Sequence, residues 1–324
     1  MDDLFDHSVL PDTCQLAGPF SDADRTATGE RRARVAFREL KTLWFNTGTL
    51  CNIACENCYI ESSPSNDRLV YISKSEVRRF LDEISRLDWP TEEIAFTGGE
   101  PFMNPEMVDI AEMSLSRGYR VLILTNAMRP MMRKHVQDGL RSLGAEHGDR
   151  LTLRVSLDHF TAERHDTLRG DGSFAISLAG MRWLADVGIT MAVAGRTLWG
   201  ETDSESRAGF RDLFARNGFS IDASSPSELV LFPEMDGATG VPEISESCWG
   251  VLGKSPDQIM CAWSRMVVKR KGAARPCVVS CTLLPYIPGF ELGSTLAESV
   301  EPISLNHPHC SKFCVLGNAS CSAG

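Results

Sequence analysis

Three cysteines in one short stretch are the residues of this sequence best suited to chemistry. Cys51, Cys55 and Cys58 follow one another at spacings of four and three, and no cysteine occurs between residues 59 and 247. Three thiolates do not complete the four-ligand site of a structural zinc ion. They can hold a [4Fe–4S] cluster whose remaining iron stays open to a cofactor or a substrate. The alternatives are three incidental cysteines, or a zinc site that a distant residue completes.

A second motif, Gly98-Gly99-Glu100, follows an apolar run that ends at Phe96. Paired glycines allow a ligand to approach the backbone closely, because they carry no Cβ. The Glu100 carboxylate beside them can accept an ammonium group. The alternative is an ordinary turn between a strand and a helix. Two such motifs after consecutive predicted strands favour a binding site.

The other cysteines gather toward the end of the sequence, and two of them flank a predicted turn. Cys261 and Cys277 lie on either side of Lys271-Gly272, a turn that predicts a β-hairpin. Together with two later thiolates they could complete a closed [4Fe–4S] cluster, or alternatively a zinc site. The expected ligands are Cys261, Cys277, Cys310 and Cys314, with Cys281 and Cys321 as alternatives for one of them.

The elements that position these residues are short apolar runs alternating with amphipathic stretches. Ser73 and Glu76 form a capping box before one such stretch, and Gly144, Gly188 and Gly218 predict the ends of three others. Alternating strands and helices indicate a parallel sheet. A complete eight-fold barrel takes about 250 residues, so we expect an α/β fold with a partial (β/α)6 TIM-like barrel, or alternatively an open doubly wound sheet. The predicted strands are 40–45, 94–96, 121–124, 151–157, 189–194 and 228–232.

Composition narrows the class of protein. The 324 residues include 33 basic and 43 acidic ones, a formal charge of −10, which argues against a nucleic-acid partner. The sequence has no run of about 18 apolar residues, so we expect no membrane partner. Its acidic first residues do not resemble a secretory signal, so we expect a cytoplasmic protein. Changes in amino-acid composition and apolar periodicity along the sequence predict an N-terminal arm at 1–36, the barrel at 37–235 and a cysteine-rich domain at 236–324.

The Cys-x3-Cys-x2-Cys motif followed by Gly-Gly-Glu resembles the radical S-adenosylmethionine (SAM) superfamily over about residues 40–235. The resemblance implies that the three cysteines hold a [4Fe–4S] cluster and that SAM chelates its fourth iron. An electron from a donor such as a flavodoxin or ferredoxin would cleave SAM to a 5′-deoxyadenosyl radical, which abstracts hydrogen from a substrate. The implied enzyme is an oxidoreductase whose cofactor carries the chemistry while the protein positions it.

The resemblance also implies contacts to SAM. Glu100 matches the carboxylate that binds the SAM amino group, and Arg169 matches the arginine that pairs with the SAM carboxylate, as guanidinium geometry allows. Tyr59 matches the aromatic residue whose main chain faces the adenine. The other matching cofactor-binding positions are Gly98, Gly99, Asn126, Ser156, Asp158 and Gly195.

Residues 248–321 resemble the SPASM and twitch extensions that hold auxiliary clusters in some of these enzymes. The last cysteines depart from the full SPASM spacing, which favours one auxiliary [4Fe–4S] cluster over two. Only about 40 residues precede the first strand, too few for a leader-peptide-binding domain of ordinary size. This slightly favours a small polar metabolite as substrate over a peptide or protein side chain. A remote alternative is a non-catalytic iron–sulfur scaffold or sensor.

Overall fold

The computed structural model of the chain describes residues 18–233 and 240–317. Six parallel strands form its framework, and neighbours in sequence are neighbours in the sheet. This arrangement confirms the α/β fold with a six-stranded partial barrel, and each predicted strand overlaps an observed one. The strands are β2 (Thr42–Asn46), β3 (Glu93–Thr97), β4 (Arg120–Thr125), β5 (Leu151–Ser156), β6 (Thr190–Thr197) and β7 (Leu229–Pro233).

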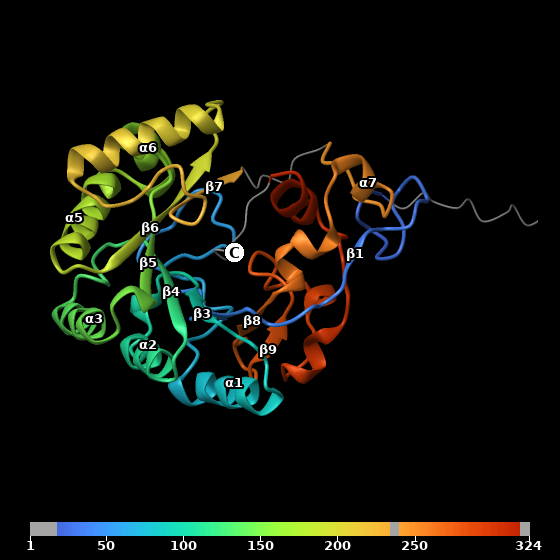
Figure 1. Cartoon of the computed structure of the whole chain (residues 1–324), viewed down its shortest axis with the longest axis horizontal. Coiled ribbons are helices and arrows are strands. Elements are labelled where there is room, and N and C mark those ends of the chain that lie inside the picture. Colours follow the sequence, from blue (N-terminus) through green and yellow to red (C-terminus); the bar gives the residue numbers. More distant parts are fainter. Residues whose placement is uncertain (1–17, 234–239, 318–324) are drawn as a thin grey trace, which may run out of the picture.

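Helices cover the outer face of this sheet (Figure 1). The predicted capping box begins the first of them, because the Ser73 hydroxyl accepts from the Glu76 N–H at 3.3 Å and the Ser73 N–H donates to the Glu76 carboxylate at 3.0 Å. Gly218 ends the last of them, as predicted. The helices are α1 (Lys74–Leu87), α2 (Met107–Ser116), α3 (Lys134–His147), α5 (Ser173–Asp186) and α6 (Asp203–Asn217).

Two features of the helices differ from the sequence prediction. Gly144 does not end α3, which continues to His147 and is followed by Gly148. A Cβ at Gly144 would lie 3.1 Å from the Ile189 side chain, so this glycine allows the helix to pack closely on the chain leading into β6. The short helix α4 (Ala162–Arg169) was not predicted. It follows β5 and brings Arg169 to the ends of the strands.

Alternate residues of each strand face two different cores. Leu43 and Phe45 of β2 pack in the core that the sheet shares with the helices. Trp44, between them, packs in a second core with C-terminal residues such as Phe290 and Phe313. The period of two along a strand produces this division. The C-terminal part of the chain therefore covers the face of the sheet that the helices leave open (Figure 1).

The predicted hairpin is present as β8 (Ser264–Val268) and β9 (Cys277–Val279), which pair antiparallel. β8 also pairs in parallel with β2, so the hairpin extends the barrel sheet to eight strands. Near the start of the chain, β1 (Arg34–Val35) pairs with β10 (Ile303–Ser304). The C-terminal part also contains α7 (Cys248–Leu252) and a π-helix (Cys310–Val315).

The domain boundaries stay predictions. The one at residue 235 falls at positions that the structure does not describe, and the described part of the arm contacts the C-terminal part, where the Ala33 N–H donates to the Ile244 carbonyl at 2.9 Å. Among the described residues, no helix combines the length and the apolar character that crossing a membrane requires.

Candidate active site

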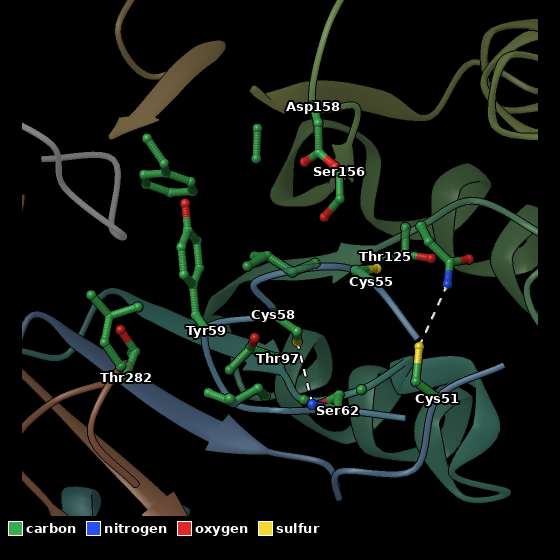
Figure 2. Close-up of a pocket in the computed structure, with 18 of the residues that line it drawn as sticks. Cys51, Cys55, Cys58, Tyr59, Ser62, Thr97, Thr125, Ser156, Asp158 and Thr282 are labelled. Carbon is green, nitrogen blue, oxygen red and sulfur yellow. Dashed lines mark hydrogen bonds between the residues drawn. The ribbon is translucent and has the colours of Figure 1, made fainter. Parts of the chain in front are cut away.

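The strand ends and the loop after β2 surround a cavity of about 150 Å³ (Figure 2). The loop carries Cys51, Cys55 and Cys58, and all three thiols line the cavity. Of the residues that the sequence singled out for the cofactor, all but Glu100 line it as well: Tyr59, Gly98, Gly99, Asn126, Ser156, Asp158, Arg169 and Gly195.

The cysteine loop is held by hydrogen bonds to its sulfur atoms and to its backbone. The Ser62 N–H donates to Cys58 Sγ at 3.3 Å, and the Asn126 amide donates to Cys51 Sγ at 3.9 Å (Figure 2). The Glu56 N–H donates to the Leu168 carbonyl of α4 at 2.8 Å. The loop itself and two neighbouring segments thus fix the thiols at the rim of the barrel.

The paired glycines let the loops after β2 and β3 touch. A Cβ at Gly98 would lie 2.5 Å from the Gly48 carbonyl oxygen, and one at Gly99 would lie 2.1 Å from the Leu50 carbonyl oxygen. Gly98 also has φ +146°, in the region that glycine adopts readily. The sequence predicted close approach of a ligand, and the structure adds close approach of the cysteine loop itself.

Glu100 does not line the cavity. Its buried carboxylate accepts from the Asn126 N–H at 2.8 Å, from the Thr125 hydroxyl at 2.9 Å and from the Phe102 N–H at 3.2 Å. Burial raises its pKa to about 7, although these donors lower it. The carboxylate therefore joins the ends of β3 and β4 behind the cavity wall, where its own chain satisfies it.

Two arginines and one carboxylate form the charged wall of the cavity. Asp158 accepts two bonds from Arg169, at 2.6 and 2.9 Å, and lies 3.7 Å from Arg196 Nε. Burial by itself would raise the pKa of Asp158, but the two guanidinium groups hold it below its ordinary value. Burial by itself would lower the pKa of Arg169, but the neighbouring Asp158 carboxylate raises this pKa above its ordinary value. The wall stays ionised and offers fixed cationic groups.

Arg196 is a site residue that the sequence reasoning did not assign. Its guanidinium donates to the Asn57 carbonyl at 2.7 Å and lies 4.6 Å from the centre of the Tyr59 ring. It therefore joins β6 to the cysteine loop. Neighbouring Gly195 permits β6 to pack closely on α6, because a Cβ there would lie 2.9 Å from the Phe210 side chain. The signal available in the sequence was an arginine two residues beyond the predicted apolar strand 189–194.

The residues around this cavity suit a thiolate-bound cluster. Burial raises the pKa of Cys51 to about 12, so the thiol needs a cation to become a thiolate, and a bound cluster supplies one. The Ser62 hydroxyl, also on the wall, is buried and has no hydrogen-bond partner among the described residues. A sulfur of a bound cluster would offer this hydroxyl an acceptor.

A second cavity, of about 20 Å³, lies in the C-terminal part. Four thiols line it, and Cys277 is not among them. Cys277 lies instead beside Arg270 and Glu291 on the hairpin, where burial and the Glu291 charge raise its pKa. Cys281, which the sequence gave only as an alternative, lines the cavity in its place, while Cys321 lies outside the described residues. The four lining cysteines are Cys261, Cys281, Cys310 and Cys314.

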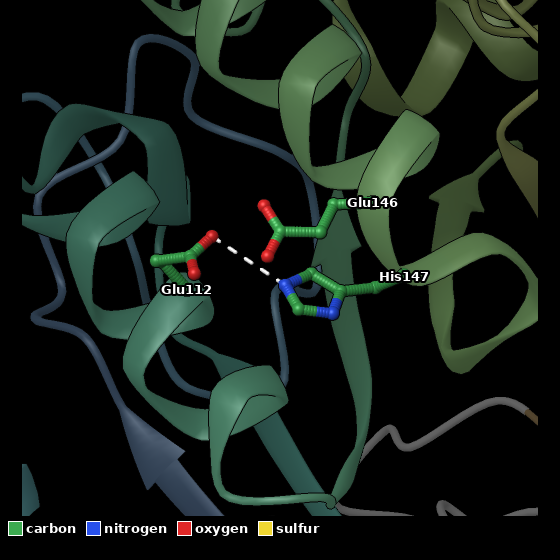
Figure 3. Close-up of side chains that lie close together, drawn as sticks. All are labelled: Glu112, Glu146 and His147. Carbon is green, nitrogen blue, oxygen red and sulfur yellow. Dashed lines mark ion pairs between the residues drawn. The ribbon is translucent and has the colours of Figure 1, made fainter.

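One other cluster has the geometry of a metal site but a different chemistry. The ligand atoms of Glu112, Glu146 and His147, on α2 and α3, lie within 4.8 Å of one another (Figure 3). Arg150 lies 2.9 Å from His147 Nδ1, and because a guanidinium can only donate, Nδ1 accepts. The neutral ring then carries its proton on Nε2, which faces the Glu112 carboxylate at 3.5 Å. This nitrogen has no lone pair for a cation.

A model of the radical SAM superfamily matches residues 45–208. The chain therefore belongs to this superfamily, as its motifs indicated. SAM and a [4Fe–4S] cluster are the cofactors of its members, so the chain is a SAM-binding iron–sulfur enzyme. The cysteine-rich C-terminal part fits an auxiliary [4Fe–4S] cluster.

Two curated relatives and one solved structure illustrate the similarity. The chain is 28% identical over 274 residues to the antilisterial bacteriocin subtilosin biosynthesis protein AlbA of Bacillus subtilis (strain 168), covering 78% of this chain and 57% of that protein. It is 31% identical over 135 residues to the AdoMet-dependent heme synthase of Methanosarcina barkeri (strain Fusaro / DSM 804), covering 41% and 36%. The chain thus spans less than two thirds of these relatives.

The structure of Streptococcus suis SuiB bound to S-adenosylmethionine has the same fold. The two are 12% identical with a TM-score of 0.57, and the match covers 80% of this chain and 63% of SuiB. This similarity supports the partial barrel that the strand order shows.

Proposed function

We propose that the chain is a radical SAM maturase that modifies a side chain of a peptide or protein, using one cluster in each cysteine-lined cavity. The observation that carries the proposal is that the two cavities share part of one wall. Thr282 lines the first cavity, Cys281 lines the second, and Leu283 lines both. A substrate held beside SAM would then lie next to the auxiliary cluster.

In the first cavity, Cys51, Cys55 and Cys58 would hold the cluster that binds SAM. When bound, the cluster and SAM supply a 5′-deoxyadenosyl radical that abstracts hydrogen from the substrate. Asp158 accepts from Nε and Nη2 of Arg169, so Nη1 and the second N–H of Nη2 are the donors proposed to bind the SAM carboxylate. We keep the SAM contacts expected from the sequence for the other residues that line the cavity. For the Glu100 carboxylate we propose a different role, which is to hold the ends of β3 and β4 together.

In the second cavity, the proposed ligands are the four cysteines that line it, with Cys281 replacing Cys277. Cys310 and Cys314 lie on the π-helix, and Cys261 lies just before β8. Burial raises the pKa of Cys261 to about 11 and that of Cys310 to about 12. Such buried thiols release their protons to solvent when a metal binds their sulfur atoms.

The proposed substrate class rests on the apolar residues that line the first cavity. They include Trp44, Phe232, Leu283 and Phe313, and the Phe232 and Phe313 rings lie 5.0 Å apart. An apolar wall suits an amino-acid side chain better than the small polar metabolite that the sequence slightly favoured. The subtilosin biosynthesis relative, whose name refers to a bacteriocin, supports the same choice. Its match of 274 residues is longer than the superfamily match over residues 45–208, so the similarity is not confined to the part that all superfamily members share. The heme synthase match covers only 41% of the chain and says less about a substrate.

We also propose that the enzyme works in the cytoplasm with a flavodoxin or ferredoxin as its electron donor. The nine described cysteines are all free thiols. The cytoplasm keeps thiols reduced, and both proposed sites need them in that form.

The proposal can be tested with the anaerobically reconstituted protein, SAM and a reductant. Candidate peptides encoded beside the gene and a panel of small polar metabolites are supplied in parallel, and 5′-deoxyadenosine and substrate mass are measured. We expect a peptide to change mass while the metabolites do not. Conversion of a polar metabolite with no peptide product would overturn the substrate class. A variant with alanine at Cys51, Cys55 and Cys58 is the control without SAM cleavage.

A further inference from the structure

Ser280 stands on the wall of the second cavity, next to one of its cysteines. It lies between β9 and Cys281, and its side chain is almost completely buried, with 1% of the residue exposed. Its backbone N–H donates to the Phe290 carbonyl at 2.9 Å. Its hydroxyl has no hydrogen-bond partner among the described residues.

A buried hydroxyl without a partner is rare, because a polar group that leaves water loses hydrogen bonds it must regain elsewhere. The surroundings of Ser280 offer little to replace them. Ile259, Phe290 and Leu305 are apolar neighbours on the same wall. The polar groups of the wall are the four thiols, Ser280 itself and His309, and Ser280 makes no hydrogen bond to them. An acceptor is therefore expected inside the cavity.

We propose that the Ser280 hydroxyl donates a hydrogen bond to a sulfur of the auxiliary cluster and thereby raises the reduction potential of that cluster. The inference rests on the proposed function, since it requires a cluster in this cavity. A donor to a cluster sulfur withdraws electron density and stabilises the reduced state. Ser280 is thus a positioning and tuning residue, and it is not a ligand.

The location of Ser280 gives this effect a consequence for the reaction. Cys281 follows it directly, and Thr282 and Leu283 then line the first cavity. The cluster would therefore be separated from the substrate by a segment of only two residues. Its potential decides how readily it exchanges an electron across that short segment.

The test is a redox titration of the auxiliary cluster, followed by electron paramagnetic resonance. It is made in protein whose Cys51, Cys55 and Cys58 are alanine, so that the other cluster does not contribute. Ser280→Ala is expected to shift the midpoint potential to more negative values and to keep the iron content. Ser299→Ala is the matched control, because Ser299 is equally buried but its hydroxyl already donates to the Leu296 carbonyl at 2.7 Å. Its potential should equal that of the parent.

The outcomes separate the two proposals. An unchanged potential in Ser280→Ala with full iron overturns the role of Ser280 and leaves the proposed function standing. Absence of any cluster in the parent protein overturns the proposed auxiliary site itself. If Ser280→Ala holds no cluster, Ser280→Thr decides, since it keeps the hydroxyl. A parental potential in that variant supports the inference, and a lowered one overturns it.

Discussion

The first cavity takes its three cysteines from residues 51–58, whereas the second takes four from a stretch between Cys261 and Cys314. The first measures about 150 Å³ and has a charged wall made by Asp158 and two arginines. The second measures about 20 Å³, and its wall is mostly apolar. A roomy, charged cavity suits a site where a polar cofactor binds and a substrate arrives. A cavity lined by four thiols suits a closed cluster whose ligands all come from the protein.

The largest expected effect is the loss of the first site. Replacing Cys51, Cys55 and Cys58 together by alanine should abolish SAM cleavage, measured as 5′-deoxyadenosine, because no thiolate then holds the cluster that binds SAM. Iron should fall from about eight to about four atoms per chain, counting four per [4Fe–4S] cluster. Cys248→Ala, outside both cavities, is the control and should keep both values. Loss of all iron in the triple variant would mean that the sites are not independent.

The second prediction compares two cysteines four positions apart. Cys281→Ala should lose the auxiliary cluster and stop product formation while SAM cleavage persists, because the radical is generated in the other cavity. Cys277→Ala should keep about eight irons per chain, because its thiol lies beside Arg270 and Glu291, away from the cavity. Iron content and product mass distinguish the two variants. The reverse pattern would restore Cys277 as a ligand.

A smaller effect is expected at the charged wall. Arg169→Lys keeps the charge but loses the planar pair of donors that Asp158 orients. A hydrogen bond to a charged group contributes about 1.5–3 kcal/mol, so SAM affinity should fall roughly ten- to a hundredfold. Equilibrium dialysis with labelled SAM measures the change. Arg164→Lys, on the same helix but outside the cavity, is the matched control. Equal affinities would show that Arg169 serves Asp158 alone.

The smallest effect on SAM is expected at Glu100. Its pKa rises from 4.5 to about 7 on folding, so the folded protein keeps a proton that the unfolded chain releases between these pH values. Its contribution to stability is therefore full below pH 4.5 and decreases as the pH rises to 7. The decrease amounts to roughly 3 kcal/mol.

Glu100→Gln has no proton to release, so its free energy of unfolding should lack this pH dependence. Urea unfolding of both proteins across this window measures the difference. SAM affinity should stay close to that of the parent, since the carboxylate faces Asn126 and Thr125. A loss of roughly ten- to a hundredfold would instead mean that the carboxylate contacts the SAM ammonium.

The sequence by itself determined the features that depend on neighbouring residues. The capping box of Ser73 and Glu76 and the hairpin turn at Lys271-Gly272 are local hydrogen-bond and backbone preferences, and both are present. The six parallel strands follow from apolar runs whose length and alternation any parallel sheet requires. The first cysteine group is also local, because one loop carries all three thiols into one cavity.

Only the tertiary structure decided which face each side chain presents and which distant segment it meets. Spacing could not show that Cys281 lines the second cavity and Cys277 does not, because the lining combines the segment after β9 with a π-helix near the end of the chain. Likewise, the Glu100 carboxylate faces donors at the end of β4, and Arg196 reaches the cysteine loop from β6. These contacts join residues far apart in sequence. No local period or spacing encodes them, since they depend on the register and packing of the whole sheet.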